Sequence, residues 1–146
     1  MIAAAAVLGL AVFALVPGKE PSAELQALES DPMAAYAPSG GTLVDTRLRN
    51  EGIELGRSVH AELSRLYELG RGSGEPRLQH ARRAAVAAGW SHLSAEFQVA
   101  GARAFRATRR LEGGRAELTV TVYVRATLLP KDVDPPALQV TLRRLG

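Results

Sequence analysis

Residues 102–128, with the sequence ARAFRATRRLEGGRAELTVTVYVRATL, read as a β-hairpin whose strands run over Ala102–Glu112 and Arg115–Leu128. A two-residue Gly113-Gly114 loop fits a type I′ turn, because both of its central positions need a positive φ. Such a turn would set the register, and opposite charges or threonines facing each other across strands favour pairing. The predicted pairs on the polar face are Glu112 with Arg115, Arg110 with Glu117, and Thr108 with Thr119.

The other face of this hairpin is predicted to be apolar. Arg109 is the exception on that face, so a β-bulge or an open sheet edge is expected there. The apolar residues are Phe105, Ala107 and Leu111 on the first strand and Ala116, Leu118, Val120, Val122 and Val124 on the second.

Four further segments alternate between apolar and polar residues, as half-buried strands do. Arg65 falls on the apolar face of one of them, so we expect it near a sheet edge or where the strand leaves the core. A loop over residues 130–136 precedes the last strand. The four predicted strands are Thr42–Arg49, Ser58–Leu69, Trp90–Val99 and Leu138–Arg144.

A helix is predicted over Glu75–Gly89. Pro76 suits the first turn of a helix, and Gly89 suits the position just past its end. The apolar positions recur at helical spacing and are mostly alanine, which permits close packing on a sheet. The inward residues are Leu78, Ala81, Ala85 and Ala88, and the outward residues are Arg77, Gln79, Arg82 and Arg83.

The predicted order is therefore two strands, one helix and four strands. One helix on one face of a largely antiparallel sheet is an α+β architecture. Residues 42–146 are enough for one such domain with a single core. The chain has no cysteine, which excludes disulfides and thiolate chemistry.

Upstream, Ile2–Val16 (IAAAAVLGLAVFALV) contains no charged residue and ends at Pro17-Gly18. As a helix it would reach about 22 Å, against roughly 30 Å for a hydrocarbon core. We interpret residues 1–18 as a transmembrane anchor whose upstream part would precede Met1. The alternatives are the apolar region of a signal peptide and a buried helix of a soluble domain. A signal peptide would normally show a positive region and a small-x-small cleavage site, and neither stands here.

Residues 19–41 are predicted to form a juxtamembrane stalk. Within it, Ser22 would N-cap a short helical turn over Ala23–Glu29, and Asp31-Pro32 would end that turn. This flank carries one lysine against four acidic residues. Since basic flanks favour the cytoplasmic side, the C-terminal domain is expected outside the cytoplasm of a single-pass cell-membrane protein.

We predict no catalytic, cofactor-binding or metal-ligating residue, and we do not expect an enzyme. Gly70-x-Gly72-x-Gly74 resembles part of a dinucleotide fingerprint, but Glu75 stands where the third glycine belongs. The three histidines, His60, His80 and His92, lack the spacing of zinc ligands. No Gly-x-Ser-x-Gly motif occurs, and the acid pairs Glu51/Glu54 and Asp132/Asp134 are interpreted as solvated loop residues.

The formal net charge is +3 and nearly all of the 18 basic residues are arginine. Clustered arginines could form a basic surface for nucleic acid or for anionic envelope polymers. Few aromatic residues lie among them, so we expect a salt-bridged, solvated face that contacts anionic lipid or an envelope protein, and not nucleic acid. The clusters are Arg82-Arg83, Arg103/Arg106/Arg109/Arg110 and Arg143-Arg144.

The Ala/Val/Leu-rich N-terminal segment is followed by Asp31-Pro32-Met33-Ala34-Ala35-Tyr36-Ala37-Pro38-Ser39-Gly40, then by an alanine-rich helix that ends in Gly-Trp (Ala84–Trp90), and then by a run of strands. In this order the chain resembles uncharacterised single-pass or exported proteins of actinobacteria, and that resemblance implies no activity.

We therefore expect a membrane-tethered extracytoplasmic domain that binds or scaffolds in the cell envelope. One alternative is an envelope hydrolase with a site of dispersed Ser, His and acidic residues. The other is a soluble nucleic-acid binder, which requires that Ile2–Val16 be a buried helix.

Overall fold

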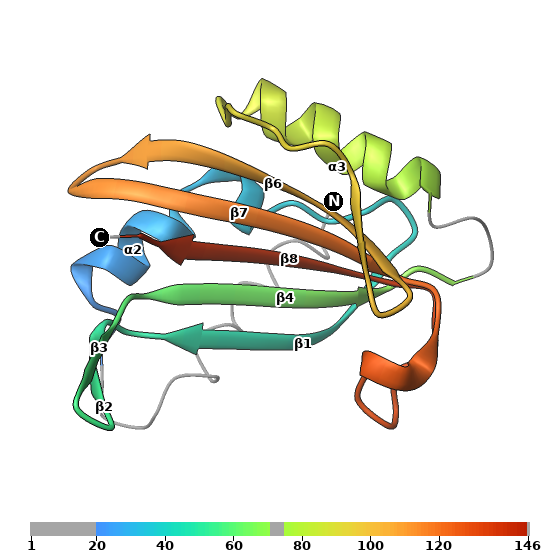
Figure 1. Cartoon of the computed structure of the whole chain (residues 1–146), viewed down its shortest axis with the longest axis horizontal. Helices are drawn as coiled ribbons and strands as arrows, with labels where there is room; N and C mark the ends of the chain where they lie inside the picture. Colours follow the sequence, from blue (N-terminus) through green and yellow to red (C-terminus); the bar gives the residue numbers. More distant parts are fainter. Residues whose placement is uncertain (1–19, 71–74, 146) are drawn as a thin grey trace.

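Six strands form one antiparallel sheet in the computed structural model, which describes residues 20–70 and 75–145 (Figure 1). Helices cover one face of this sheet, so the predicted α+β class with a mostly antiparallel sheet is confirmed. Across the sheet the strands are β1 (Thr42–Arg49), β4 (Glu62–Glu68), β8 (Ala137–Arg144), β7 (Gly114–Tyr123), β6 (Ala102–Leu111) and β5 (Phe97–Val99).

Two helices and a short 3₁₀ turn cover the sheet, where one helix was predicted. Helix α3 (Glu75–Ala87) lies over β6 and β7, and its inward residues Leu78, Ala81 and Ala85 are buried as predicted. Helix α2 (Ala23–Glu29) packs over β4 and β8, and the 3₁₀ turn η1 (Pro32–Ala34) packs beside it on β8. All three elements share one hydrophobic core with the sheet.

The interpretation of residues 19–41 as a stalk is wrong where the structure describes them. Ser22 caps α2 as predicted, with its Oγ accepting a hydrogen bond from the Leu25 N–H at 3.2 Å. Leu25 and Leu28 are fully buried, and Met33 is 1% exposed. Because these side chains complete the core over β4 and β8, the domain begins at α2 and not at residue 42.

The central hairpin forms, but its register differs from the prediction by two residues. The loop consists of Glu112 and Gly113, of which only Gly113 has a positive φ (82°), and Leu111 pairs with Gly114. Arg110 therefore lies opposite Arg115, and Thr108 lies opposite Glu117. A shift of two keeps every side chain on its predicted face, because strand side chains alternate with a period of two. Phe105, Ala107, Leu118 and Val120 are accordingly buried.

Several strand boundaries were predicted wrongly. Only Phe97–Val99 of the predicted strand over residues 90–99 pairs as β5, and β7 ends at Tyr123. The predicted strand Ser58–Leu69 is divided between β4 and β3 (Arg57–Val59), which forms a separate hairpin with β2 (Gly52–Glu54). Alternation alone cannot show these breaks, because it continues through residues that leave the sheet.

Arg65 lies on β4, which pairs with both β1 and β8 and is next to the edge strand β1, so the predicted position near a sheet edge is confirmed. Its side chain is buried, and Nη1 donates a hydrogen bond to the carbonyl of Ala34 in η1. Two residues further along β4, the Tyr67 hydroxyl donates to the Tyr36 carbonyl at 2.9 Å, and burial raises the pKa of Tyr67. Residues 34–36 thus supply one acceptor for Arg65 and one for Tyr67, while Arg65 Nε has no hydrogen-bond partner among the described residues.

The apolar segment Ile2–Val16 lies outside the described residues. Within residues 20–70 and 75–145, no helix is long and apolar enough to cross a membrane.

The role of α2 in the core can be tested by replacing Leu28 with alanine. We expect the free energy of unfolding to fall by roughly 2–5 kcal/mol, because the substitution leaves a cavity at a fully buried site. The measurement is urea unfolding of the full chain in mild detergent, followed by fluorescence of Trp90, the single tryptophan. As a control, Leu55→Ala changes a fully exposed leucine and should alter stability by less than about 0.5 kcal/mol. Equal effects of the two variants would contradict the packing of α2 in the core.

Candidate anion-binding site

A hollow of about 600 Å³ lies between α2, the turn that joins β6 to β7, and the end of β8. Its volume is within the range of small-ligand sites. Two arginines and three acidic residues contribute to its wall. The charged lining residues are Glu24, Asp31, Arg109, Glu112 and Arg144.

Asp31 lies in the sequence Asp-Pro, which follows the end of α2 as predicted, and it is also the N-cap residue of η1. Its side chain is 0% exposed. Oδ1 accepts hydrogen bonds from the Met33 N–H at 2.8 Å and from the indole Nε1 of Trp90 at 3.0 Å. Oδ2 accepts from Arg109 Nη1 at 2.8 Å. This one carboxylate therefore joins three parts of the chain: η1, Trp90 shortly after α3, and Arg109 of β6.

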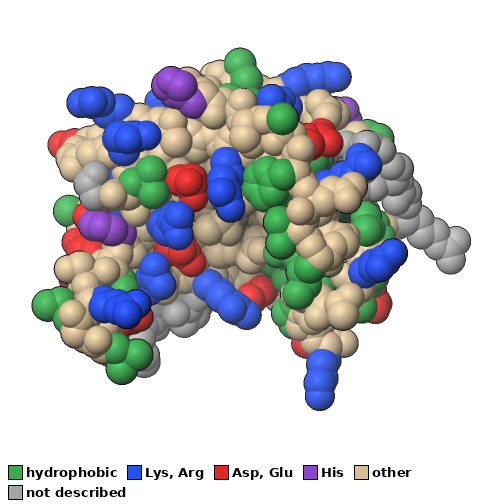
Figure 2. Space-filling view, in the orientation of Figure 1, with side chains coloured by type: hydrophobic (Ala, Val, Ile, Leu, Met, Phe, Trp, Pro, Cys, Tyr) green, Lys and Arg blue, Asp and Glu red, His purple; other side chains and the backbone are tan. Residues whose placement is uncertain are grey.

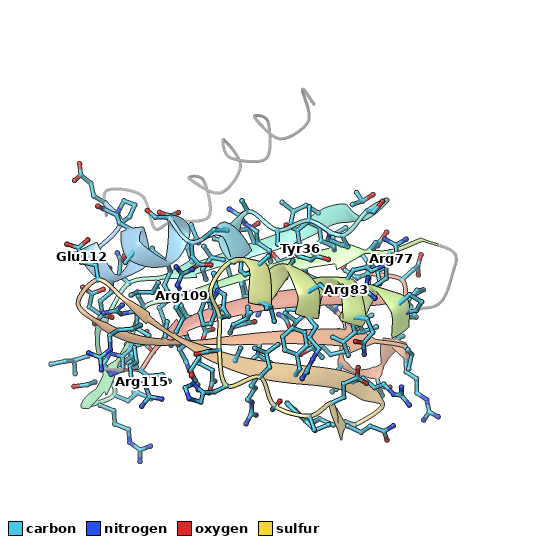
Figure 3. The ribbon with its side chains drawn as sticks, turned by 90° about the horizontal axis from the view of Figure 1, so that it is seen from above. Tyr36, Arg77, Arg83, Arg109, Glu112 and Arg115 are labelled. Carbon is cyan, nitrogen blue, oxygen red and sulfur yellow. The ribbon has the colours of Figure 1, made fainter. Side chains whose placement is uncertain are left out.

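No bulge occurs at Arg109, whereas the predicted open edge is present in part: β5 pairs only with Ala102–Ala104 of β6, and near Arg109 this side of β6 has, among the described residues, only the isolated bridge between Ser91 and Thr108. Strand β6 pairs with β7 without interruption from Ala102 to Leu111, and Arg109 lies on the helix-covered face. Its Nη1 bonds Asp31 and also donates to the Ala88 carbonyl. Figure 3 shows Arg109 between α2 and α3. The carboxylate of Asp31 neutralises the charge that the alternation pattern places against the core.

Arg144 is buried without such a partner. It lies on the same face of β8 as the core residues Leu138, Val140 and Leu142, and it is 3% exposed. Its Nε and Nη1 are buried and have no hydrogen-bond partner among the described residues. Its Nη2 reaches the turn at Gly113, where a Cβ would lie 3.2 Å away. Burying a charge without compensation is costly, so a negative group in the hollow would stabilise this guanidinium.

Two acidic side chains border the hollow besides Asp31. Glu24 is already engaged, since its Oε2 accepts from the Ala61 N–H at 3.1 Å and its Oε1 lies 3.7 Å from His60 Nδ1. Glu112 stands exposed on the β6–β7 turn, and Figure 3 places it on the far side of Arg109 from α3. These acids make the rim a mixed-charge environment, which disfavours multiply charged anions relative to a single anionic group.

A second, smaller hollow of about 220 Å³ lies on the open face of the sheet, which is the face opposite α2 and α3. Figure 2 shows side chains of both charges over this face. Glu117 pairs there with Arg143 at 2.9 Å, in place of the predicted Arg110. Gln139 Nε2 donates to Ser64 Oγ and Gln139 Oε1 accepts from Tyr123, so many of these polar groups satisfy one another. This face has the character of a solvated antiparallel sheet surface.

The predicted arginine clusters do not form one surface. Arg109 and Arg144 point to the helix-covered side, whereas Arg106 stacks over the Phe97 ring at 4.9 Å. Arg82 packs over the Phe105 ring and donates to the Ser94 carbonyl at 2.7 Å. A single continuous basic surface is therefore absent from the described parts of the chain.

The three histidines do not converge. His60 lies beside Glu24, His80 is on α3, and His92 contacts the hydroxyls of Ser91 and Thr108. In the described ranges no three residues of the types that bind metals are grouped. Glu51 and Glu54 are exposed beside and within β2, and Asp132 and Asp134 lie in the loop before β8. Most of the loop that contains Gly70, Gly72 and Gly74 is outside the described residues.

Sequence reasoning did not single out the hollow, although a signal was present. The alternation of β8 puts Arg144 on the face of Leu138, Val140 and Leu142, just as the alternation of β6 puts Arg109 inward. Two inward arginines in neighbouring segments indicate either a buried acid or a binding site.

The bridging role of Asp31 can be tested with two substitutions. Asp31→Ala should lower the free energy of unfolding by about 3 kcal/mol, because it leaves Arg109 and two N–H donors without their acceptor. Asp31→Asn should cost less, since an amide oxygen can still accept from Met33 and Trp90. Urea unfolding followed by Trp90 emission measures both.

The matched control is Asp45→Ala, which removes an exposed ion pair with Arg47. We expect a change below about 1 kcal/mol for that surface pair. A loss from Asp31→Ala no larger than that of the control would show that the bridge does not hold the three segments together.

Comparison with protein-family models, with curated proteins and with solved structures finds no match for this chain. Its resemblance to actinobacterial single-pass or exported proteins stays a prediction.

Proposed function

We propose that this chain is a membrane-tethered, extracytoplasmic binding module that takes an anionic group beside Arg144. The observation that carries this proposal is the buried guanidinium of Arg144, which lines a hollow of about 600 Å³ and has two unpartnered nitrogens among the described residues. A carboxylate or a phosphate group in the hollow would compensate the charge of this guanidinium.

A comparison of the arginines on the helix-covered face supports a binding role for Arg144 in particular. Arg109 has the Asp31 carboxylate, and Arg65 has the Ala34 carbonyl. The Asp31 carboxylate compensates the charge of Arg109, whereas Arg65 has one neutral acceptor and its Nε has no hydrogen-bond partner among the described residues. Arg144 alone of the three lines the hollow without an acceptor on the described chain. A guanidinium suits such a site because its fork of N–H groups matches carboxylate and phosphate oxygens.

The rim narrows the class of ligand. Glu24 and Glu112 would repel a second negative charge on the same molecule, while a neutral or cationic remainder would be tolerated or favoured. We therefore propose a ligand with one anionic group, such as the carboxylate of an amino acid, of a peptide terminus or of a cell-wall component.

The tether is proposed from the sequence of Ile2–Val16 and from the scarcity of basic residues in the flank that follows it. Glu20 precedes α2 by three residues, and α2 lines the hollow. An anchored segment would thus hold the site close to the membrane surface, where envelope components are concentrated.

Arg144→Met tests the binding site, because a ligand-binding arginine and a structural arginine predict opposite effects of the substitution on stability. If Arg144 binds a ligand, the variant should be at least as stable as the wild type in chloride buffer, since an uncompensated buried charge is removed. Acetate, compared with chloride at equal ionic strength, should raise the thermal midpoint of the wild type by ligand linkage and should leave Arg144→Met unchanged. Differential scanning fluorimetry of the full chain in detergent measures both effects.

Arg143→Met is the matched control, because it removes the neighbouring arginine from the open face of β8. It should keep the anion response, and Glu112→Gln should strengthen that response by removing a negative charge from the rim. An unresponsive wild type together with a strongly destabilised Arg144→Met would mean that Arg144 is structural, and the proposal would fall.

The tether and its orientation are tested with a reporter that is active only outside the cytoplasm, fused after Gly146. We expect activity in the membrane fraction. Activity released into the medium would mean that the apolar segment is cleaved, and an inactive soluble fusion would overturn the proposed location.

A further inference from the structure

The β2–β3 hairpin exposes two large apolar side chains at its tip. Its strands pair Gly52 with Val59 and Glu54 with Arg57. Ile53 is 78% exposed and Leu55 is 104% exposed, the two highest values among the large apolar residues of the described chain. In Figure 1 the hairpin stands away from the six-stranded sheet at one end of the molecule. These side chains therefore make little contribution to the folded core.

The backbone at the tip makes Leu55 more unusual still. The two loop residues, Leu55 and Gly56, have φ values of 50° and 74°, and a two-residue loop with both values positive is a type I′ turn. Asn, Asp and Gly are preferred at such positions, and a bulky residue with positive φ is an outlier. Leucine at this position destabilises the turn, because its φ is positive, and it exposes apolar surface to water. Strained, exposed residues of this kind point to a contact outside the fold.

The base of this hairpin is bonded to the beginning of the described chain. Asn50 Nδ2 donates to the Glu20 carbonyl at 3.2 Å, and Asn50 Oδ1 accepts from the Ser22 N–H at 2.8 Å. Glu20 follows the apolar segment by only four residues, which span at most about 14 Å when extended. From Asn50 to Leu55 the hairpin reaches about 17 Å at most. The chain length therefore allows at most about 14 Å between Glu20 and the apolar segment, and at most about 17 Å between Asn50 and the hairpin tip.

We propose that Ile53 and Leu55 insert into the interface of the bilayer that holds Ile2–Val16. This inference rests on the tether proposed above. The occupant of the tip is the lipid bilayer and not another protein, because Glu20, only four residues after the apolar segment in the sequence, is bonded to the base of the hairpin. Glu54 and Arg57 face each other across the strands that flank the turn, so the tip carries balanced charge and should not require anionic lipid. Bilayer contact at this second point would limit rotation of the domain about its tether.

The absence of cysteine from the sequence allows a clean labelling experiment. The full chain with Leu55→Cys carries a polarity-sensitive fluorophore and is reconstituted into phosphatidylcholine vesicles. We expect blue-shifted emission and severalfold stronger quenching by lipids with brominated acyl chains than for the control. The control is Val99→Cys, which places the same label at an exposed valine on β5, the opposite edge strand of the sheet.

A further variant separates the native tip from the affinity of the label for lipid. Ile53→Asn in the Leu55→Cys background should reduce the quenching severalfold if the apolar tip itself drives insertion. Unchanged quenching in that variant would mean that the label alone enters the bilayer, and it would overturn the inference. If quenching is lost when the chains are diluted to one per vesicle, the tip contacts a second copy of the chain and not the bilayer. That result would also overturn the inference.

Flotation of the same vesicles distinguishes this inference from the proposal on which it rests. If the chain floats with the vesicles but positions 55 and 99 are quenched equally, the tether stands and insertion of the hairpin is refuted. If the chain does not float, both the tether and the insertion are refuted.

Discussion

The buried carboxylate of Asp31 is the interaction on which the arrangement of this domain depends. It caps η1 through the Met33 N–H, accepts the indole N–H of Trp90 just beyond α3, and forms an ion pair with Arg109 of β6. Three segments that are remote in the sequence are held by two oxygen atoms. Because a buried carboxylate is stable only when its acceptor capacity is used, each of these segments stabilises the position of the other two.

This bridge also explains why a hollow can exist beside it. With α2 and η1 fixed against β4 and β8, the turn between β6 and β7 stands apart from α2 and leaves the space that Arg144 lines. Arg109 and Arg144 differ in how the fold compensates their charge. Arg109 is neutralised by a group of the fold, whereas Arg144 is buried next to a space large enough for a ligand. The open face of the sheet offers no similar imbalance, since Glu117 pairs with Arg143 and Gln139 bonds both Ser64 and Tyr123.

The first described residues connect this site to the proposed membrane environment. Glu20 and Ser22 are bonded to Asn50, at the base of the β2–β3 hairpin, and α2 begins at once after them. The described chain thus starts between the base of the hairpin and α2, the helix that lines the hollow. A domain held at two points on a bilayer would present its hollow in a restricted orientation, which suits the capture of a ligand that is itself part of the envelope.

Local sequence patterns predicted the limits of β1, the helix after Glu75, the C-terminal strand and the faces of the residues within β6 and β7. Alternation and helical spacing are local properties, and neighbouring residues are enough to specify them. The hairpin register could not be predicted in this way, because a shift of two residues keeps every side chain on its face, and Glu117 pairs with Arg143 of β8 instead of Arg110. The packing of residues 20–41 on the sheet and the partners of the inward arginines likewise depend on tertiary contacts. Alternation showed that Arg109 points to the core, but its partner lies 78 residues away, and only the packed chain can show that Asp31 is there and that no such partner reaches Arg144 among the described residues.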